Sequence, residues 1–335
     1  MADLLLHIKD GYFFEVPRPL ARYHWKSIDE VPSWLMQWEI HKVDPNAHWK
    51  SLDEVPQSFR DAHPRLFNVN EWNRAMDGKI LIPQPFGTPK NLYEAGTGFC
   101  ISRFMILELV AALLLVVVFV RLANRVRKGG IARGSFWNMA EGMLEFLRDY
   151  VVKPAIGSHD ADRFVPLLWT LFLFILTCNL IGLVPWTGAP TVTLGVTFAL
   201  AIVTFITSLV SGMIRFGFIG FWKNQVPHMD LPVAFLILKP IIFVMEVGGL
   251  LIRHAVLAVR LLANMAAGHL VLAAILGLIV IAGETTSTGQ WMTVSVIAVV
   301  GSALLSLLEL FVAFLQAYVF TFLSALFIGA AIHHH

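Results

Sequence analysis

The sequence predicts an all-α polytopic membrane protein with a polar head at its N-terminal end. Of its 335 residues, 57% are hydrophobic and only 14% are charged, a composition typical of membrane chains. The charges are unevenly placed, because 24 of the 48 Asp, Glu, Lys and Arg residues lie in residues 1–100 and nine follow Arg163. We therefore expect an extramembrane region over residues 1–100 and a membrane domain over residues 101–335. The net charge of +2 provides no basic field for nucleic acid.

The N-terminal region contains an internal repeat, HWKSIDEVP at 24–32 and HWKSLDEVP at 48–56. In each copy a serine is followed three residues later by a glutamate, which is the spacing of a capping box. A proline then ends the short helix that this box predicts. Two copies are too few for a solenoid. The repeat is compatible with a duplicated structural hairpin and with a docking surface, and the sequence leaves both open.

Three apolar spans of ordinary length are predicted, at residues 103–122, 164–186 and 192–216. The first span is followed by cations that place its loop in the cytoplasm by the positive-inside rule. These cations are Arg121, Arg125, Arg127, Lys128 and Arg133. Residues 134–153 carry apolar side chains near helical spacing with charges between them, which indicates an amphipathic helix on the membrane surface.

Two further apolar segments, residues 232–282 and 291–332, are longer than one membrane crossing requires. Residues 240–282 alone would form roughly 65 Å of helix, about twice the ~30 Å thickness of the hydrocarbon core. Either Gly248 and Gly249 break the first segment, or the helix is steeply tilted. We expect about five membrane-embedded helices, the last two forming a long tilted hairpin. This count places the N-terminus outside and the C-terminus in the cytoplasm.

Polar and ionisable side chains lie inside these apolar helices. A charge near the bilayer centre costs ~3 kcal/mol on insertion scales, so it usually has a task or a partner. At ~100° per residue, Arg260 and Asn264 share one side of a helix and His269 faces the opposite side, toward another neighbour. Glu309 and Gln316 are seven residues apart and share a face of the last helix. The candidate proton-path residues are Asn179, Glu246, Arg260, Asn264, His269, Glu309 and Gln316.

Less specific interpretations of these residues remain open. A buried pair between Arg260 and Glu309 would hold two helices together without moving protons. A single asparagine in a span, such as Asn179, often makes only an interhelical hydrogen bond. An intramembrane hydrolase would need a nucleophile and a base; Ser302 and Ser306 lie near Glu309 in sequence, but no histidine is obviously placed for them.

The sequence favours neither a metal nor a cofactor. His159, Asp160 and Asp162 cluster before the second span, where a solvated helix start is a better interpretation than a metal site. A secondary transporter or ion channel that works alone would favour an internal repeat across its spans, and we find none there.

At these residues the chain resembles subunit a of the F-type rotary ATP synthases. The segment RLLANMAAGH at 260–269 is similar to the family pattern R-L-x-x-N-M-x-x-G-[EH]. LELFVAFLQAYVFTFLSALFIG resembles its last helix, CNLIGLVPW its second span and DLLLHIKDGYFFEVP its N-terminal entry. The resemblance covers about residues 1–16 and 100–332 and leaves the repeat region outside it.

The resemblance implies roles for individual residues. Arg260 matches the essential arginine that faces the c-ring. His269 and Glu309 match two positions at which the family has one acid and one histidine in either order. Glu246 matches an acid of the long helix, and Gln316 matches a glutamine near the arginine. Two aqueous half-channels would carry protons to and from the c-ring carboxylates, with His269, Glu309 and Glu246 along the outer one.

The resemblance also implies partners and a location. The implied partners are the c-ring, subunit b of the peripheral stalk, other ATP synthase subunits and the lipid bilayer. The chain would not be an enzyme on its own. We expect the bacterial cytoplasmic membrane, with the mitochondrial inner membrane as the alternative.

Overall fold

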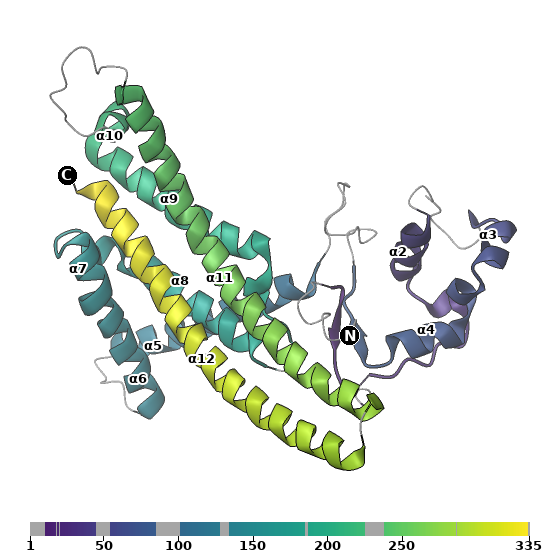
Figure 1. The fold of residues 1–335 in the computed structure, drawn as a ribbon. Helices are drawn as coiled ribbons and strands as arrows, with labels where there is room; N and C mark the ends of the chain where they lie inside the picture. Colours follow the sequence, from purple (N-terminus) through teal and green to yellow (C-terminus); the bar gives the residue numbers. More distant parts are fainter. Residues whose placement is uncertain are drawn as a thin grey trace. The chain divides into compact units, whose positions relative to one another are not determined.

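The computed structural model (Figure 1) describes the chain in stretches: 11–17, 19, 21–44, 54–84, 101–127, 134–184, 187–224, 238–285 and 287–333. The chain divides into two units. The head unit comprises Lys9–Leu107 with Pro185–Thr187, and the membrane unit comprises Met1–Ile8, Glu108–Val184 and Gly188–His335. Each is considered by itself below.

The head unit has a hydrophobic core of its own under short helices and one small sheet. Strands β1 (Phe13–Glu15) and β2 (Lys79–Leu81) pair antiparallel, with Phe14 opposite Ile80. The helices are η1 (Ile28–Glu30), α2 (Ser33–Val43), α3 (Gln57–Ala62), η3 (Pro64–Phe67) and α4 (Val69–Met76). The buried core consists of Val31, Leu35, Met36, Ile40, Val55, Trp72 and Met76. The head is therefore a folded module and not only a polar extension.

The first repeat copy forms the short helix that the sequence predicts, but without the expected capping box. The Ser27 side chain makes no capping hydrogen bond, and the Glu30 carboxylate accepts from the backbone N–H of Lys26 at 2.8 Å. The helix η1 ends at Glu30, and α2 begins after Pro32. Asn73 of α4 holds this copy through two 3.1 Å hydrogen bonds with the backbone of Trp25. Most of the second copy, residues 48–53, lies outside the described residues.

The membrane unit is entirely helical in its described residues, and the predicted polytopic all-α fold is confirmed. Five of its helices are long and apolar enough to cross a membrane. Its elements are α5 (Arg103–Arg127, which begins in the head unit), α6 (Ser135–Phe146), η4 (Leu147–Val152), α7 (Lys153–Ile156), α8 (Ala161–Gly182), η5 (Pro190–Val192), α9 (Leu194–Phe216), α10 (Phe218–Asn224), α11 (Leu238–Thr285) and α12 (Thr288–Ile332).

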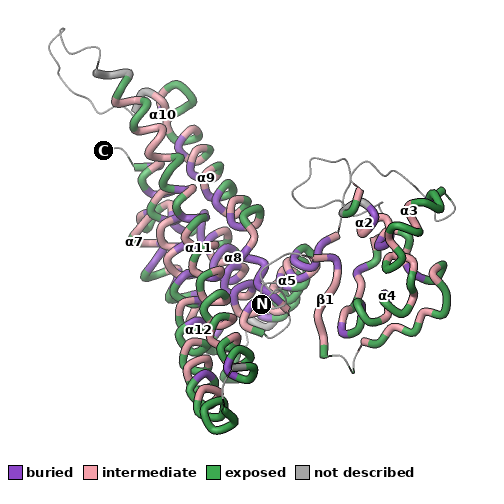
Figure 2. Tube along the Cα trace, turned by 45° about the vertical axis from the view of Figure 1, so that its right-hand side comes forward, coloured by how far each residue is buried: buried purple, intermediate pink, exposed green. Residues whose placement is uncertain are grey.

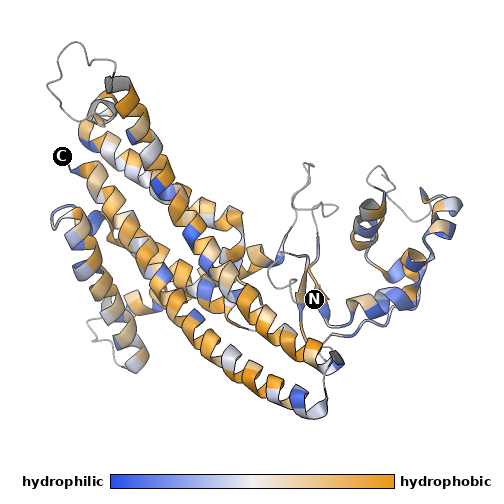
Figure 3. Ribbon diagram, viewed as in Figure 1, coloured by the Kyte–Doolittle hydropathy of each residue, from blue (hydrophilic) through white to orange (hydrophobic). Residues whose placement is uncertain are grey.

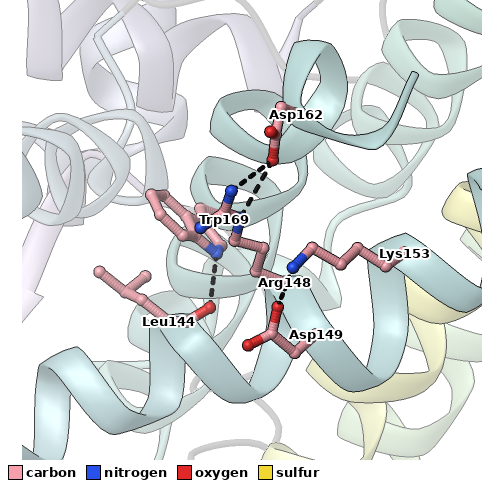
Figure 4. Close-up of polar contacts among 6 residues, drawn as sticks. All are labelled: Leu144, Arg148, Asp149, Lys153, Asp162 and Trp169. Atoms are coloured by element: carbon pink, nitrogen blue, oxygen red, sulfur yellow. Dashed lines mark hydrogen bonds and ion pairs between the residues drawn. The ribbon is translucent and has the colours of Figure 1, made fainter. Parts of the chain in front are cut away.

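The segment predicted as one amphipathic helix is built from α6, a single π-helical turn (η4) and α7. Figure 4 shows how polar contacts attach it to α8: the Trp169 indole donates to the Leu144 carbonyl at 3.0 Å, and Arg148 pairs with Asp162 at 2.8 Å. Lys153 pairs with Asp149 at 2.6 Å on the exposed surface. This hydrogen bond with Lys153 holds the pKa of Asp149 below its ordinary value.

Helices α11 and α12 form the long hairpin that the sequence predicts, and they lie side by side along much of their length (Figure 1). The helix α11 runs through Gly248 and Gly249 without interruption, so these glycines do not break it. The beginning of the predicted segment, residues 232–237, lies outside the described residues. Much of the hairpin surface is exposed and apolar (Figures 2 and 3), with Leu307 and Val244 more than 60% exposed. Such a surface requires lipid or a partner protein to cover it.

Candidate functional site

Two polar contacts join α11 to α12 inside the hairpin. The Asn264 amide donates to the Gln316 side-chain oxygen at 2.7 Å, and Gln316 is 1% exposed. The second contact joins the His269 Nδ1 and a Glu309 carboxylate oxygen at 3.6 Å. Both residues of this second pair are largely shielded by protein, with side-chain exposures of 16% and 5%. The structure thus brings together four of the seven predicted site residues as two pairs.

The second pair depends on a glycine. A Cβ atom added to Gly268 would lie 2.6 Å from the Glu309 Oε1 atom, closer than real side chains approach. The absence of a side chain at this position leaves space for the carboxylate against α11. Gly248 on the same helix has no heavy atom within 4 Å of such a Cβ, so a side chain would fit there without displacing a neighbour.

The helical-wheel prediction about neighbours was wrong for His269. Asn264 and His269 are five residues apart, about 140° round the helix, and both contact α12. Both side chains can reach α12 if the line along which α11 touches α12 runs midway between them. Each side chain then lies about 70° from that line, half of the angle of about 140° between them. The angle alone did not show where that line runs.

Arg260 lies on α11 one helical turn before Asn264 and is partly exposed. In the part of the chain that the structure describes, no hydrogen bond or ion pair to its guanidinium group is found. The alternative of a structural pair between Arg260 and Glu309 is not what the structure shows, because Glu309 lies beside His269. Arg260 is therefore a cation whose charge the described residues do not neutralise.

Asn179 makes interhelical hydrogen bonds, as the structural interpretation of this residue anticipates. Its amide donates to the Ala313 carbonyl of α12 at 3.3 Å, and its side-chain oxygen accepts from the Thr191 hydroxyl at 2.9 Å. Asn179 is fully buried. It fixes α8 and η5 against the stretch of α12 that lies between Glu309 and Gln316.

Glu246 lies on the other side of Arg260 from His269 along α11. It is about 21 Å before Arg260, whereas His269 is about 13.5 Å after it, at ~1.5 Å per residue. The two residues are therefore separated by 23 positions of one continuous helix, and the expectation that Glu246 lines the outer half-channel stays a prediction. Its carboxylate lies 3.4 Å from the Arg253 guanidinium group.

Two residues of α11 escaped the sequence reasoning, Arg253 and His254. His254 is 3% exposed, and its Nδ1 lies 2.9 Å from the Leu250 carbonyl oxygen. Its ring packs between Phe205 of α9 and Phe327 of α12, with centroids 5.2 and 4.7 Å away. The signal for both residues was present, because each is an ionisable side chain in a helix that is otherwise apolar.

The residues considered for other chemistries have contacts of their own. The hydroxyl groups of Ser302 and Ser306 donate to backbone carbonyls of their own helix. Of the acids near the predicted start of the second span, Asp162 pairs with Arg148, and Asp160 lies 3.9 Å from Arg215. Among the described residues, no group of three His, Cys, Asp or Glu side chains is placed to hold a metal ion.

Comparisons with known proteins identify the family of the chain. Residues 105–329, which contain both polar pairs, match the family model described as ATP synthase A chain. The chain is 40% identical to ATP synthase subunit a of Myxococcus xanthus over 238 residues, which cover 70% of this chain and 75% of the relative. It is 36% identical to ATP synthase subunit a of Chloroherpeton thalassium, over 78% of this chain and 76% of the relative.

One further relative extends the similarity to the head. ATP synthase subunit a of Anaeromyxobacter sp. (strain Fw109-5) is 32% identical over 337 aligned residues, which span 100% of this chain and 71% of the relative. The chain therefore belongs to the ATP synthase A chain family, as a multi-pass, non-catalytic membrane subunit that works with other ATP synthase subunits.

Proposed function

We propose that this chain forms two aqueous half-channels that carry protons to and from the carboxylates of the c-ring, and so couples ion flow to rotation. One observation carries the proposal: Arg260 is a cation on a membrane helix for which no counter-charge is found among the described residues, and it lies within three helical turns of two polar pairs. A chain that needed polar groups only for packing would pair its charges, since an unpaired charge in lipid is costly.

Arg260 provides the electrostatic step. A rotor carboxylate that arrives protonated from the lipid loses its proton near the guanidinium group, because a cation within ~4–6 Å favours the ionised form. The guanidinium does not itself release a proton. Arg260 therefore separates the two half-channels and prevents a direct leak. A membrane potential supplies ~2.3 kcal/mol per proton per 100 mV and biases the direction of rotation.

His269 and Glu309 belong to the outer half-channel in this proposal. The cation-rich loop after the first span places the end of α11 near Thr285 on the outer side. The His269 Nδ1 and the Glu309 carboxylate oxygen, 3.6 Å apart, are slightly too distant for a good direct hydrogen bond, and a small movement of either side chain would bring them into contact for proton transfer. Asn264 and Gln316 lie nearer Arg260 and hold α12 at the level of the arginine.

The apolar surface of the hairpin is suited to the rotor. Leu304, Leu307, Leu308 and Phe311 are neighbouring exposed or half-exposed side chains on α12. A hydrophobic surface lets a membrane rotor move past without forming fixed polar contacts. We accordingly propose the c-ring and the peripheral-stalk subunit b as direct partners. We propose the bacterial cytoplasmic membrane as the location, since the similar proteins named above come from bacteria.

A transporter or channel that works alone is the competing function. Such proteins often bind their substrate between repeated membrane halves, and the sequence has no repeat across its spans. Isolation of the chain from native membranes separates the two functions. Copurification with c subunits supports the ATP synthase role, and ion transport by the purified chain alone would contradict it.

Arg260→Ala tests the proposed role of the arginine. We expect loss of ATP-driven proton pumping in membrane vesicles while the chain still inserts, because removal of a charge lowers the insertion cost. Arg148→Ala is a matched control, since Arg148 forms an ion pair outside the candidate site. Normal pumping by vesicles that carry Arg260→Ala would refute the assignment.

A further inference from the structure

Three charged residues follow one stripe of α11 at intervals of seven: Glu246, Arg253 and Arg260. Seven residues turn an α-helix through about 700°, which returns each side chain to within ~20° of the last. Successive members of this stripe are about 10.5 Å apart along the axis. The continuous helix therefore carries a second arginine on the side that presents Arg260.

The two arginines differ in their partners. The Arg253 guanidinium lies 3.4 Å from the Glu246 carboxylate, and the side chains are 53% and 41% exposed. Both groups are thus accessible from outside the chain. For Arg260 no counter-charge is found among the described residues. One cation on the stripe is neutralised and the other is not.

The helix is too long to stand upright in a membrane. Its 48 residues extend for about 72 Å, whereas the hydrocarbon core is ~30 Å thick. If the whole helix is embedded, its axis lies closer to the membrane plane than to the normal. A step of about 10.5 Å from Arg260 to Arg253 then lies largely in the membrane plane, the plane in which a rotor carboxylate moves.

From these observations we propose that Glu246 is the counter-ion of Arg253, and that it leaves Arg260 as the single effective cation for the rotor carboxylate. The inference rests on the proposed function of Arg260. A guanidinium paired with a carboxylate presents a dipole, whose field falls off faster than that of a lone charge. Without Glu246, Arg253 would become a second holding site for the carboxylate and would delay rotation. Glu246 is thus a positioning residue that acts through Arg253.

A direct proton-carrying role for Glu246 makes a different prediction. If Glu246 itself carried protons, its replacement would slow transport whether or not Arg253 retained its charge. If it neutralises Arg253, removal of both charges together would restore turnover. The charge on residue 253 is therefore the variable that separates the two roles.

The test uses Glu246→Gln, Arg253→Gln, the double variant with both changes, and Glu246→Gln combined with Arg253→Lys. Proton pumping is measured per assembled complex in membrane vesicles, with assembly quantified separately. We expect Glu246→Gln to lower turnover by roughly 2- to 150-fold, the range given by coupling energies of residues in contact. Arg253→Gln should restore turnover in the double variant, whereas Arg253→Lys should not, since the lysine retains the charge.

Three results would overturn the proposal. The first is a double variant as slow as Glu246→Gln, which would assign proton transfer to Glu246 itself. The second is full turnover in Glu246→Gln. The third is a defect confined to the amount of assembled complex, which would show a purely structural ion pair. Arg260→Ala in the same membranes separates these outcomes from failure of the proposed function. If that variant still pumps protons, the proposed function itself is refuted.

Discussion

The head unit and the α11–α12 hairpin distribute apolar and polar side chains between interior and surface in opposite ways. In the head, Leu35 and Trp72 are 2% and 4% exposed within an apolar core. In the hairpin, Leu307 is 66% exposed whereas Glu309 is 5% exposed. Figures 2 and 3 together show that the exposed stretches of α12 are largely apolar. One chain thus contains a module with an apolar core and a hairpin with an apolar surface.

The difference gives buried polar groups a different meaning in the two regions. In lipid, apolar side chains face outward without cost, so burial of a leucine contributes little to helix association. A polar group there has to find a partner inside the protein. The pairs Asn264–Gln316 and His269–Glu309 follow this rule, whereas Glu246 and Arg253 pair on the exposed surface of the hairpin. The comparison predicts that changes to these pairs affect transport and that changes to the head core affect only the head.

After Arg260, the largest effects are expected at the His269–Glu309 pair, where a double-mutant cycle tests a shared site. His269→Gln and Glu309→Gln should each lower proton flux, because each removes one of two groups in contact. The exchange of the two residues, His269→Glu with Glu309→His, should retain more flux than His269→Glu or Glu309→His alone. The coupling should lie in the range of about 0.5–3 kcal/mol that is typical of residues in contact. Strictly additive losses would show that the two residues act independently.

A smaller loss is expected from Gly268→Ala. The added Cβ would lie 2.6 Å from Glu309 Oε1, so the carboxylate has to move away from α11. We expect reduced proton flux with normal assembly, since the glutamate side chain is flexible and its shift need not disturb the backbone. Gly248→Ala is the matched control on the same helix, because its Cβ meets no atom within 4 Å. Equal flux in both variants would mean that the position of the Glu309 carboxylate is not important.

Sequence patterns predicted the parts of this structure that depend on composition over long stretches. The apolar segments predicted the polytopic all-α fold, and the structure confirms it. The patterns singled out Asn264, His269, Glu309 and Gln316, because polar groups are rare in apolar helices. They did not predict which of these side chains meet. That depends on where the line of contact between α11 and α12 runs, and only tertiary packing sets this line.

Other features depended on contacts that no local pattern records. The head core joins Val31, Leu35 and Trp72 from separate short elements. No periodic apolar run in the sequence predicts this core. The prediction of a capping box at Ser27 was wrong, because the Glu30 carboxylate accepts from the backbone N–H of Lys26 instead. The ion pair between Glu246 and Arg253 was also not predicted, because Arg253 was not singled out in the sequence.

The head core should respond to mutation without altering transport. Leu35→Ala should destabilise the head by about 2–5 kcal/mol, as large-to-small substitutions in a packed core do. Limited proteolysis of the assembled complex in membranes should then cut the head faster, while proton flux per complex stays unchanged. Val43→Ala is the control, since Val43 is 45% exposed on the same helix.

Deletion of residues 23–66 with both flanks kept is the stronger form of this test. We expect flux per assembled complex to persist, because the candidate proton-path residues lie in the membrane unit. The yield of complexes should fall if the head serves assembly. A loss of flux in fully assembled complexes would show that the head contributes to the outer half-channel, and the contrast between the two regions would fail.

The smallest effect is expected at the exposed pair of Asp149 and Lys153 beside α8 (Figure 4). The hydrogen bond with Lys153 lowers the pKa of Asp149 below its ordinary value. Any contribution of the pair to stability is therefore present above that ordinary value and is lost as the pH falls through the lowered one. Asp149→Asn should leave proton flux at neutral pH unchanged, because exposed ion pairs stabilise proteins little. Thermal dissociation of the complex, compared with wild type at neutral pH and near pH 3, should show at most a small difference that shrinks in acid. A large loss of flux at neutral pH would mean that polar pairs at this surface are as important as those buried inside the hairpin.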